Sequence, residues 1–67
     1  MKIWINGDRV EIPDEVTTVA ELLSYFQLDQ KVVIVEKNKD ILQKEFHATE
    51  TVAEGDMLEL VHFVGGG

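Results

Sequence analysis

Polar and apolar residues alternate along two short stretches near the start of the chain, at residues 2–5 and 9–12. A period of two is typical of a strand that buries one face. Asn6-Gly7 lies between the stretches, and both residues tolerate the positive φ angles of a tight hairpin turn. The sequence therefore predicts a β-hairpin, which Pro13 and Asp14 end.

The next pattern has helical spacing. Val19, Leu22, Leu23 and Phe26 follow one another at i, i+3, i+4 and i+7, which gives one apolar stripe of an α-helix. Thr18 stands three residues before Glu21, and this spacing favours a capping box in which each side chain bonds the other residue's backbone N–H. We expect a helix that begins at residue 19 and fades near residues 27–28.

The second half of the chain predicts three more strands. Residues 31–37 are rich in β-branched Val and Ile, residues 41–42 follow a turn at 38–40, and residues 57–63 alternate again. Residues 43–53 have no clear period and are expected to form a loop with at most a helical turn. One helix on one face of a mixed four- to five-stranded sheet is a two-layer α+β domain. We expect the strand after the helix to run parallel to one of the hairpin strands.

Composition limits the class of protein. The chain has 67 residues, which is enough for one small domain but makes a deep catalytic pocket difficult to build. It has no cysteine, so a disulfide framework, a thiolate zinc site and a catalytic thiol are excluded. Six basic and 13 acidic residues give a net charge of −7, which disfavours nucleic acid and anionic membranes and favours a basic protein partner. We expect a cytoplasmic protein that is a monomer when free.

Few residues suggest side-chain chemistry. His47 and His62 have no ligand partner at metal-binding spacing, so we expect structural roles for both and no metal site. The carboxylates are scattered over the chain, and no phosphate-binding glycine loop is present, so the chain is not expected to bind ATP itself. The terminal Gly65-Gly66-Gly67 is uninformative when taken alone.

The order of elements together with this ending resembles the ubiquitin-like β-grasp fold. Within that fold, the sequence is most similar to the ThiS family of small sulfur carriers in thiamine biosynthesis. The similarity covers the full chain and lies mainly in residues 5–7, 33–38 and 60–67, of which the last segment, ending Phe-Val-Gly-Gly-Gly, is the most specific.

The resemblance implies a reaction cycle. An adenylating, E1-like enzyme consumes ATP to activate the carboxylate of Gly67, a sulfur donor system converts it to a thiocarboxylate, and thiazole synthase takes the sulfur. The chain would be a protein cosubstrate with no bound cofactor rather than an enzyme. Gly66 would complete the reacting pair, and Gly65 and Val64 would give the tail access. The family pattern needs two terminal glycines and this chain has three, which shifts the tail by one residue.

A partner surface can also be predicted from the period of the last strand. Leu58 and Leu60 should face the helix, so the opposite face of the sheet should carry Met57, Glu59, Val61 and Phe63. Trp4 lies between two inward isoleucines and should share that face, with further apolar area from Val32 or Val33 and from Ile34 or Val35. We expect residues 1–63 to form the domain, residues 64–67 a flexible reactive tail, and this face to dock the adenylating enzyme.

Two alternatives remain open at this point. The chain could carry sulfur for another route, such as molybdopterin synthesis or amino-acid thiolation. It could also be a ubiquitin-like module that acts by docking or by conjugation to target lysines.

Overall fold

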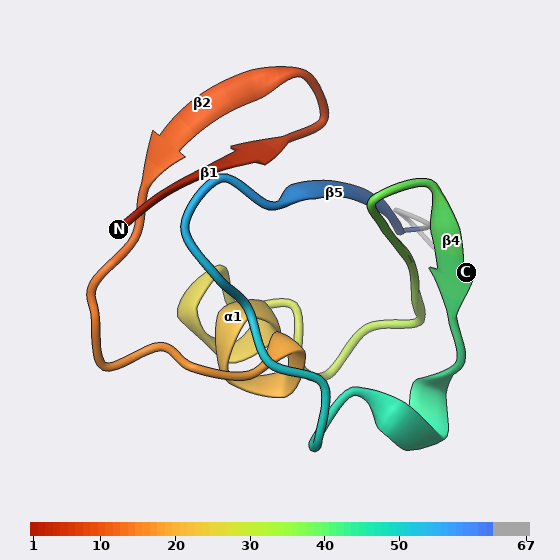
Figure 1. The fold of residues 1–67 in the computed structure, drawn as a ribbon. Helices are drawn as coiled ribbons and strands as arrows, with labels where there is room; N and C mark the ends of the chain where they lie inside the picture. The colour runs from red at the N-terminus through yellow and green to blue at the C-terminus, as the bar shows by residue number, and fades with distance from the viewer. Residues whose placement is uncertain (63–67) are drawn as a thin grey trace.

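The computed structural model describes residues 1–62 and has one helix against one five-stranded sheet. The strands pair in the order β2-β1-β5-β3-β4, and they curve around the helix (Figure 1). The elements are β1 (Lys2–Ile5), β2 (Asp8–Glu11), α1 (Val19–Tyr25), β3 (Val33–Lys37), β4 (Asp40–Leu42), the 3₁₀ turn η1 (Lys44–Phe46) and β5 (Met57–His62). The predicted α+β class and mixed sheet are confirmed.

Two tight hairpins form the outer parts of the sheet. In the first, Ile5 pairs with Asp8 across Asn6-Gly7, whose φ angles are 51° and 87°. In the second, Lys37 pairs with Asp40, and the two turn residues Asn38 and Lys39 have φ angles of 51° and 75°. Two positive φ angles in a two-residue loop give the turn whose twist matches that of the flanking strands.

The last strand, β5, lies in the middle of the sheet. It runs parallel to β1 and antiparallel to β3. The strand after the helix, β3, does run in the direction of a hairpin strand, β2, as expected. However, β1 and β5 lie between them, so the strand that pairs in parallel with the hairpin is β5.

The capping box that the sequence predicts begins α1. The Glu21 N–H donates to Thr18 Oγ1 at 3.2 Å, and the Thr18 N–H donates to Glu21 Oε1 at 3.1 Å. The helix ends at Tyr25, earlier than predicted, with Phe26 as its C-cap. Gln27 has a φ of 61°, a left-handed conformation that the α-helix cannot continue through.

The core lies between α1 and the concave face of the sheet. Its members are buried aliphatic side chains from every layer: Ile3, Ile12, Val16, Val19, Leu22, Leu23, Val35, Val52, Leu58 and Leu60. Ile12, predicted as a strand residue, comes directly after β2 and is fully buried. Likewise β3 begins at Val33 rather than at residue 31, because Lys31 still bonds back to Leu28 in the loop after the helix.

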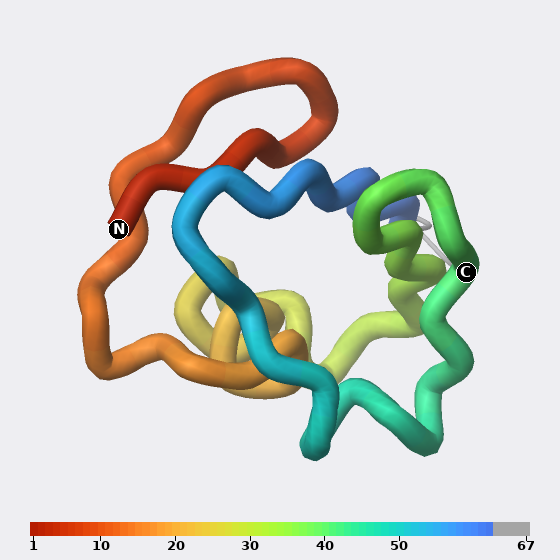
Figure 2. The backbone as a smooth tube through the Cα atoms, viewed as in Figure 1, coloured from red at the N-terminus to blue at the C-terminus, as the bar shows by residue number. Residues whose placement is uncertain are grey.

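The ambiguous segment 43–53 contains η1 and then crosses over the helix before it reaches β5 (Figure 2). Backbone bonds hold it there: the Ala20 N–H donates to His47 O at 2.8 Å, and the Val19 N–H donates to Glu50 O at 2.9 Å. Lys37 on β3 also reaches this segment, with Nζ 2.8 Å from both Glu50 Oε2 and Thr51 O. The crossing thus joins the start of the helix to the sheet.

Candidate functional site

The candidate site is the open face of the sheet, the face turned away from α1. Along β5, Leu58 and Leu60 are buried, whereas Met57, Glu59 and Val61 are exposed. This alternation places the three predicted outward residues of β5 where the period of two put them. Phe63, the fourth, lies outside the described residues.

Apolar side chains from three strands are neighbours on this face. Trp4 on β1 is opposite Met57 on β5, and Ile34 on β3 is opposite Val61. All four are at least 40% exposed. We name this set, Trp4, Ile34, Met57 and Val61, the open-face patch. Such a group of large apolar side chains left exposed is typical of an interaction surface.

The two alternatives left open for β3 are now resolved. Ile34 is the outward residue, whereas Val35 is fully buried against the helix side. Val33 is partly buried and packs against the core, while Val32, just before the strand, is 74% exposed.

Carboxylates accompany the open-face patch. Glu36 and Glu59 are directly opposite each other in the β3–β5 ladder. They line, with Trp4, Met57 and Lys39, a hollow of about 290 Å³ on this face. Like charges directly opposite across a sheet are mutually unfavourable. A guanidinium or ammonium group from a partner would relieve that repulsion, so the pair favours a basic partner.

Asn6 has a second role that the sequence did not reveal. Its side-chain Oδ1 accepts from the Leu60 N–H at 2.8 Å, and its Nδ2 donates to Leu60 O at 3.1 Å. The amide thus pairs with β5 as a peptide group would, beyond the point where β1 ends. Asn38 holds the start of the strand, since its Oδ1 accepts from the Met57 N–H at 3.0 Å. Two turn asparagines therefore hold β5, one at its first residue, Met57, and the other within the strand, at Leu60.

Neither histidine takes part in a metal cluster. Within residues 1–62, no group of three His, Cys, Asp or Glu side chains is arranged to hold a metal ion. His47 is buried, and His62 ends β5 on the helix-facing side. Each has one buried ring nitrogen without a hydrogen-bond partner among the described residues: Nε2 of His47 and Nδ1 of His62.

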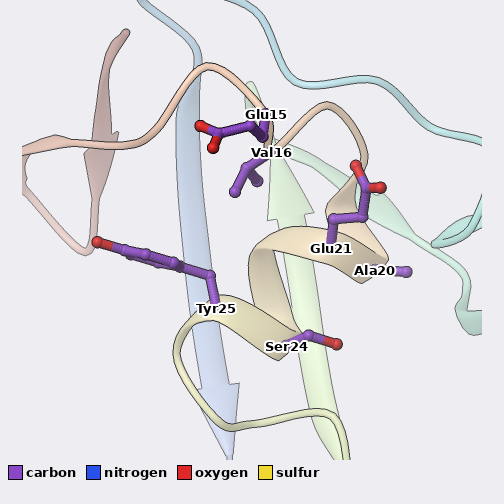
Figure 3. A pocket seen from close by; sticks show the side chains of 6 residues that line it. All are labelled: Glu15, Val16, Ala20, Glu21, Ser24 and Tyr25. Carbon is purple, nitrogen blue, oxygen red and sulfur yellow. The ribbon is translucent and has the colours of Figure 1, made fainter.

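A wider, shallow hollow of about 500 Å³ lies on the outer side of α1, away from the open face (Figure 3). One of its two carboxylates, that of Glu21, is already engaged, because it accepts from the N–H and hydroxyl of Thr17, each at 2.8 Å. These bonds hold the pKa of Glu21 below its ordinary value. A carboxylate held ionised as a helix cap is unsuited to proton transfer, so Glu21 gives this hollow no acid–base role.

Comparison with known proteins now identifies the family. The model of the ThiS family matches residues 3–67. The sulfur carrier protein ThiS of Bacillus subtilis is 43% identical over 65 residues, which are 97% of this chain and 98% of that protein. The chain belongs to the ThiS family. The sequence-based prediction of a non-catalytic sulfur carrier for thiazole formation in thiamine biosynthesis is therefore confirmed.

Other relatives of the ThiS family chain are parts of larger proteins. The thiazole synthase of Paramagnetospirillum magneticum is 40% identical over 67 residues, which are the whole of this chain and 20% of that protein. The thiazole synthase of Magnetococcus marinus is 34% identical, with the same coverage. In these relatives a ThiS-like segment and thiazole synthase share one polypeptide, which points to thiazole synthase as a partner.

The fold also agrees with solved ThiS structures. The crystal structure of the thiamine biosynthesis protein ThiS from Geobacter metallireducens matches with a TM-score of 0.82 and 35% identity, over the full length of both chains. In the described part of the chain, no helix is long and apolar enough to cross a membrane. The predicted reacting residues Gly66 and Gly67, and the tail residues Val64 and Gly65, lie outside the residues that the structure describes.

Proposed function

We propose that Gly67 carries the reacting carboxylate of this sulfur carrier. An adenylating enzyme transfers AMP from ATP to the carboxylate and releases pyrophosphate. Hydrosulfide released by a sulfur donor then attacks the acyl carbon, AMP leaves, and the product is a thiocarboxylate. The observation that carries this proposal is the family match, which extends to residue 67 and so includes the three terminal glycines.

The tail suits that chemistry. Gly66 and Gly67 have no Cβ, so a partner's backbone can approach them closely in a narrow channel. Residues 63–67 would span about 17 Å if extended, at roughly 3.3–3.6 Å per residue. That reach would place the carboxylate in another protein's active site while the domain stays outside. Val64 and Gly65 would form the access part of the tail.

The open-face patch would dock the adenylating enzyme. Two of its members, Met57 and Val61, lie on β5, the strand that precedes the tail, so binding there fixes where the tail starts. Trp4, Met57 and Val61 supply apolar area, and Phe63 would extend it. Glu59, opposite Glu36, would receive a basic side chain of the partner. Binding energy gained at this remote face can assist the reaction at the tail.

Thiazole synthase is proposed as the sulfur acceptor, on the support of the relatives in which both are one chain. ATP would be consumed by the adenylating enzyme, with no cofactor resident on the carrier. The cycle would take place in the cytoplasm, between monomers of the carrier and its enzymes.

The test is reconstitution of sulfur transfer. The full chain is charged with adenylating enzyme, ATP and a sulfur donor, then purified and given to thiazole synthase with its other substrates. We expect thiazole in an amount equal to the thiocarboxylate consumed, and none from a chain that lacks residues 66–67. Thiazole formed equally well from the truncated chain would refute the role of Gly67.

A further inference from the structure

A second hollow, of about 280 Å³, lies at the β3–β4 edge of the sheet, where helix-side residues line it together with Ile34 and Ile41 of the open face. Its walls include Leu23 at the end of α1, Leu28 in the following loop, and Leu42 on β4. These side chains belong to the core or pack against it. We name this space the β3–β4 hollow. It is separate from the hollow on the open face, which is lined by residues of β1, β3 and β5.

Apolar side chains also surround the opening of the β3–β4 hollow. Val32 is 74% exposed and Ile41 is 70% exposed, the two highest values among the large apolar residues that the structure describes. Leaving both in water forgoes the gain from burying them, which is of order 1.5–3 kcal/mol for a complete side chain. An apolar group seated in the hollow would cover part of each.

Part of the neighbouring sheet edge is unpaired within the described residues. Strand β4 ends at Leu42, which is opposite Val35. Val33 is paired with His62 of β5 on one side but has no β4 partner on the other. An extended segment of another protein could therefore lie beside Val33 and direct a side chain into the hollow, as in strand addition to a sheet edge.

The charges at the hollow differ from those of the rest of the molecule. Lys31 and Lys44 line it, and within residues 1–62 neither forms an ion pair, whereas the chain as a whole has a net charge of −7. Asp29 is the one carboxylate in the lining. His47 also lines the hollow; it is only 8% exposed, and its Nε2 is buried without a partner in the described part of the chain. An unpaired buried polar atom is costly and gains from a hydrogen-bonding ligand.

We propose that the β3–β4 hollow is a second docking site, which receives an apolar side chain with a neighbouring carboxylate from an extended acidic segment of a partner protein. The apolar side chain fills the space between the three leucines. The carboxylate lies near Lys31 and Lys44. A second copy of this chain is disfavoured as the occupant, because two molecules of charge −7 repel each other.

This inference goes beyond the carrier role and does not depend on it. The open face, with its opposed glutamates, suits a basic partner, whereas the β3–β4 hollow suits an acidic one. The hollow shares Ile34 with the open-face patch, so partners bound at the two surfaces would meet at that side chain.

The probe is a blocked tripeptide, acetyl-Asp-Leu-Asp-amide, titrated into the ¹⁵N-labelled full chain and followed by NMR. We expect amide shifts at Val33, Leu42 and His47, with Trp4 and Met57 unchanged. A single anchoring side chain should give a dissociation constant on the order of 1 mM. The neutral peptide acetyl-Asn-Leu-Asn-amide should bind about fivefold more weakly.

Variants separate the charges from the fold. The double substitution Lys31→Gln, Lys44→Gln should weaken binding of the acidic peptide about fivefold, since exposed ion pairs contribute modestly to affinity. The NMR spectrum of this variant should stay dispersed, which shows that the fold is intact. Lys2→Gln, on β1, is the control and should change nothing. Equal binding of the two peptides, shifts confined to the open face, or no shifts at all would overturn the proposal. So would concentration-dependent shifts at the hollow without peptide, which would identify a second copy as the occupant.

Discussion

The Asn6 side chain forms both hydrogen bonds of a ladder pair with the backbone of Leu60, 54 residues further along the chain. It thereby joins the first hairpin turn to the strand that precedes the tail. Asn6 also has a φ of 51°, so one residue serves the turn and the long-range contact together.

Replacing Asn6 with glycine separates these two roles. Glycine keeps the positive φ of the turn but removes both bonds to Leu60. We expect Asn6→Gly to lower the free energy of unfolding by about 2 kcal/mol, at about 1 kcal/mol for each part-buried bond. Amide exchange should accelerate most at Leu60 and its neighbours. Asn6→Asp keeps the acceptor for the Leu60 N–H, so its free energy of unfolding should lie between those of the glycine variant and the original chain. Equal unfolding free energies of all three in urea titration would contradict this.

Lys39 occupies a turn position better suited to glycine. Its φ is 75°, and two-residue hairpin loops of this type favour Asn-Gly, whereas this one is Asn-Lys. A non-glycine residue in such a conformation costs roughly 1–3 kcal/mol, which the greater entropy of glycine in the unfolded chain partly offsets. Lys39→Gly should therefore raise stability by about 1 kcal/mol in urea denaturation. Lys39→Val, with a branched Cβ, should lower it, and the opposite order would show that the turn is unstrained.

Lys37 should make the stability of the fold change with pH in the alkaline range. Its ammonium group is 2.8 Å from Glu50 Oε2 and 3.6 Å from Asp56 Oδ2, and the hydrogen bond to Glu50, followed by the charge of Asp56, holds its pKa above the ordinary value of 10.5 despite partial burial. Because the folded state holds this proton more tightly, the stabilisation is complete below about pH 10.5 and is lost as the pH rises through the folded pKa.

Lys37→Met removes that dependence. At neutral pH the variant should be less stable by about 2 kcal/mol, since bonds to charged groups contribute about 1.5–3 kcal/mol. The difference should stay constant up to about pH 10 and shrink above it. Lys2→Met, an exposed lysine on β1, is the control. If the difference in unfolding free energy between Lys37→Met and the original chain instead widened at high pH, the raised pKa assigned to Lys37 would be wrong.

The open-face patch predicts which substitutions weaken partner binding. Trp4→Ser and Val61→Asp should each weaken binding of the adenylating enzyme by at least about tenfold, because large apolar residues at interface centres dominate affinity. Stability should change little, since Trp4 is 40% and Val61 51% exposed. Phe46→Ser is the matched control, because Phe46 is also 51% exposed but lies in η1, away from the sheet face. If calorimetric titration showed the same loss of binding affinity for the two patch variants and for the control, the patch would not be the docking surface.

Much of this fold could be predicted from local patterns. The first hairpin, the Thr18–Glu21 cap and the inward and outward residues of β5 each follow from neighbours in the sequence, and the structure confirms them. The helix α1 ends earlier than its apolar stripe predicts, because the stripe extends to Phe26 while the left-handed Gln27 stops the helix. The order of the strands in the sheet also could not be predicted from local patterns, since the central place of β5 depends on pairing between distant residues.

The site could be predicted only in part, because local patterns do not show which distant residues pair. Alternation placed Trp4, Met57 and Val61 on the open face, but only the register brings Ile34 beside Val61 and Glu36 opposite Glu59. The bonds of Asn6 and Asn38 to β5 could not be foreseen, because a turn asparagine gives no sign of which distant backbone its side chain meets. The family resemblance, rather than any pattern, carried the assignment of Gly66 and Gly67.

The central claim is that Gly67 carries sulfur, and intact-protein mass tests it most directly. The full chain is incubated with the adenylating enzyme, ATP and a sulfur donor, beside a chain lacking residues 66–67. We predict a mass increase equal to the exchange of one oxygen for sulfur, located by fragmentation at Gly67 and absent from the truncated chain. An unchanged mass, under conditions that convert Bacillus subtilis ThiS, would contradict the account.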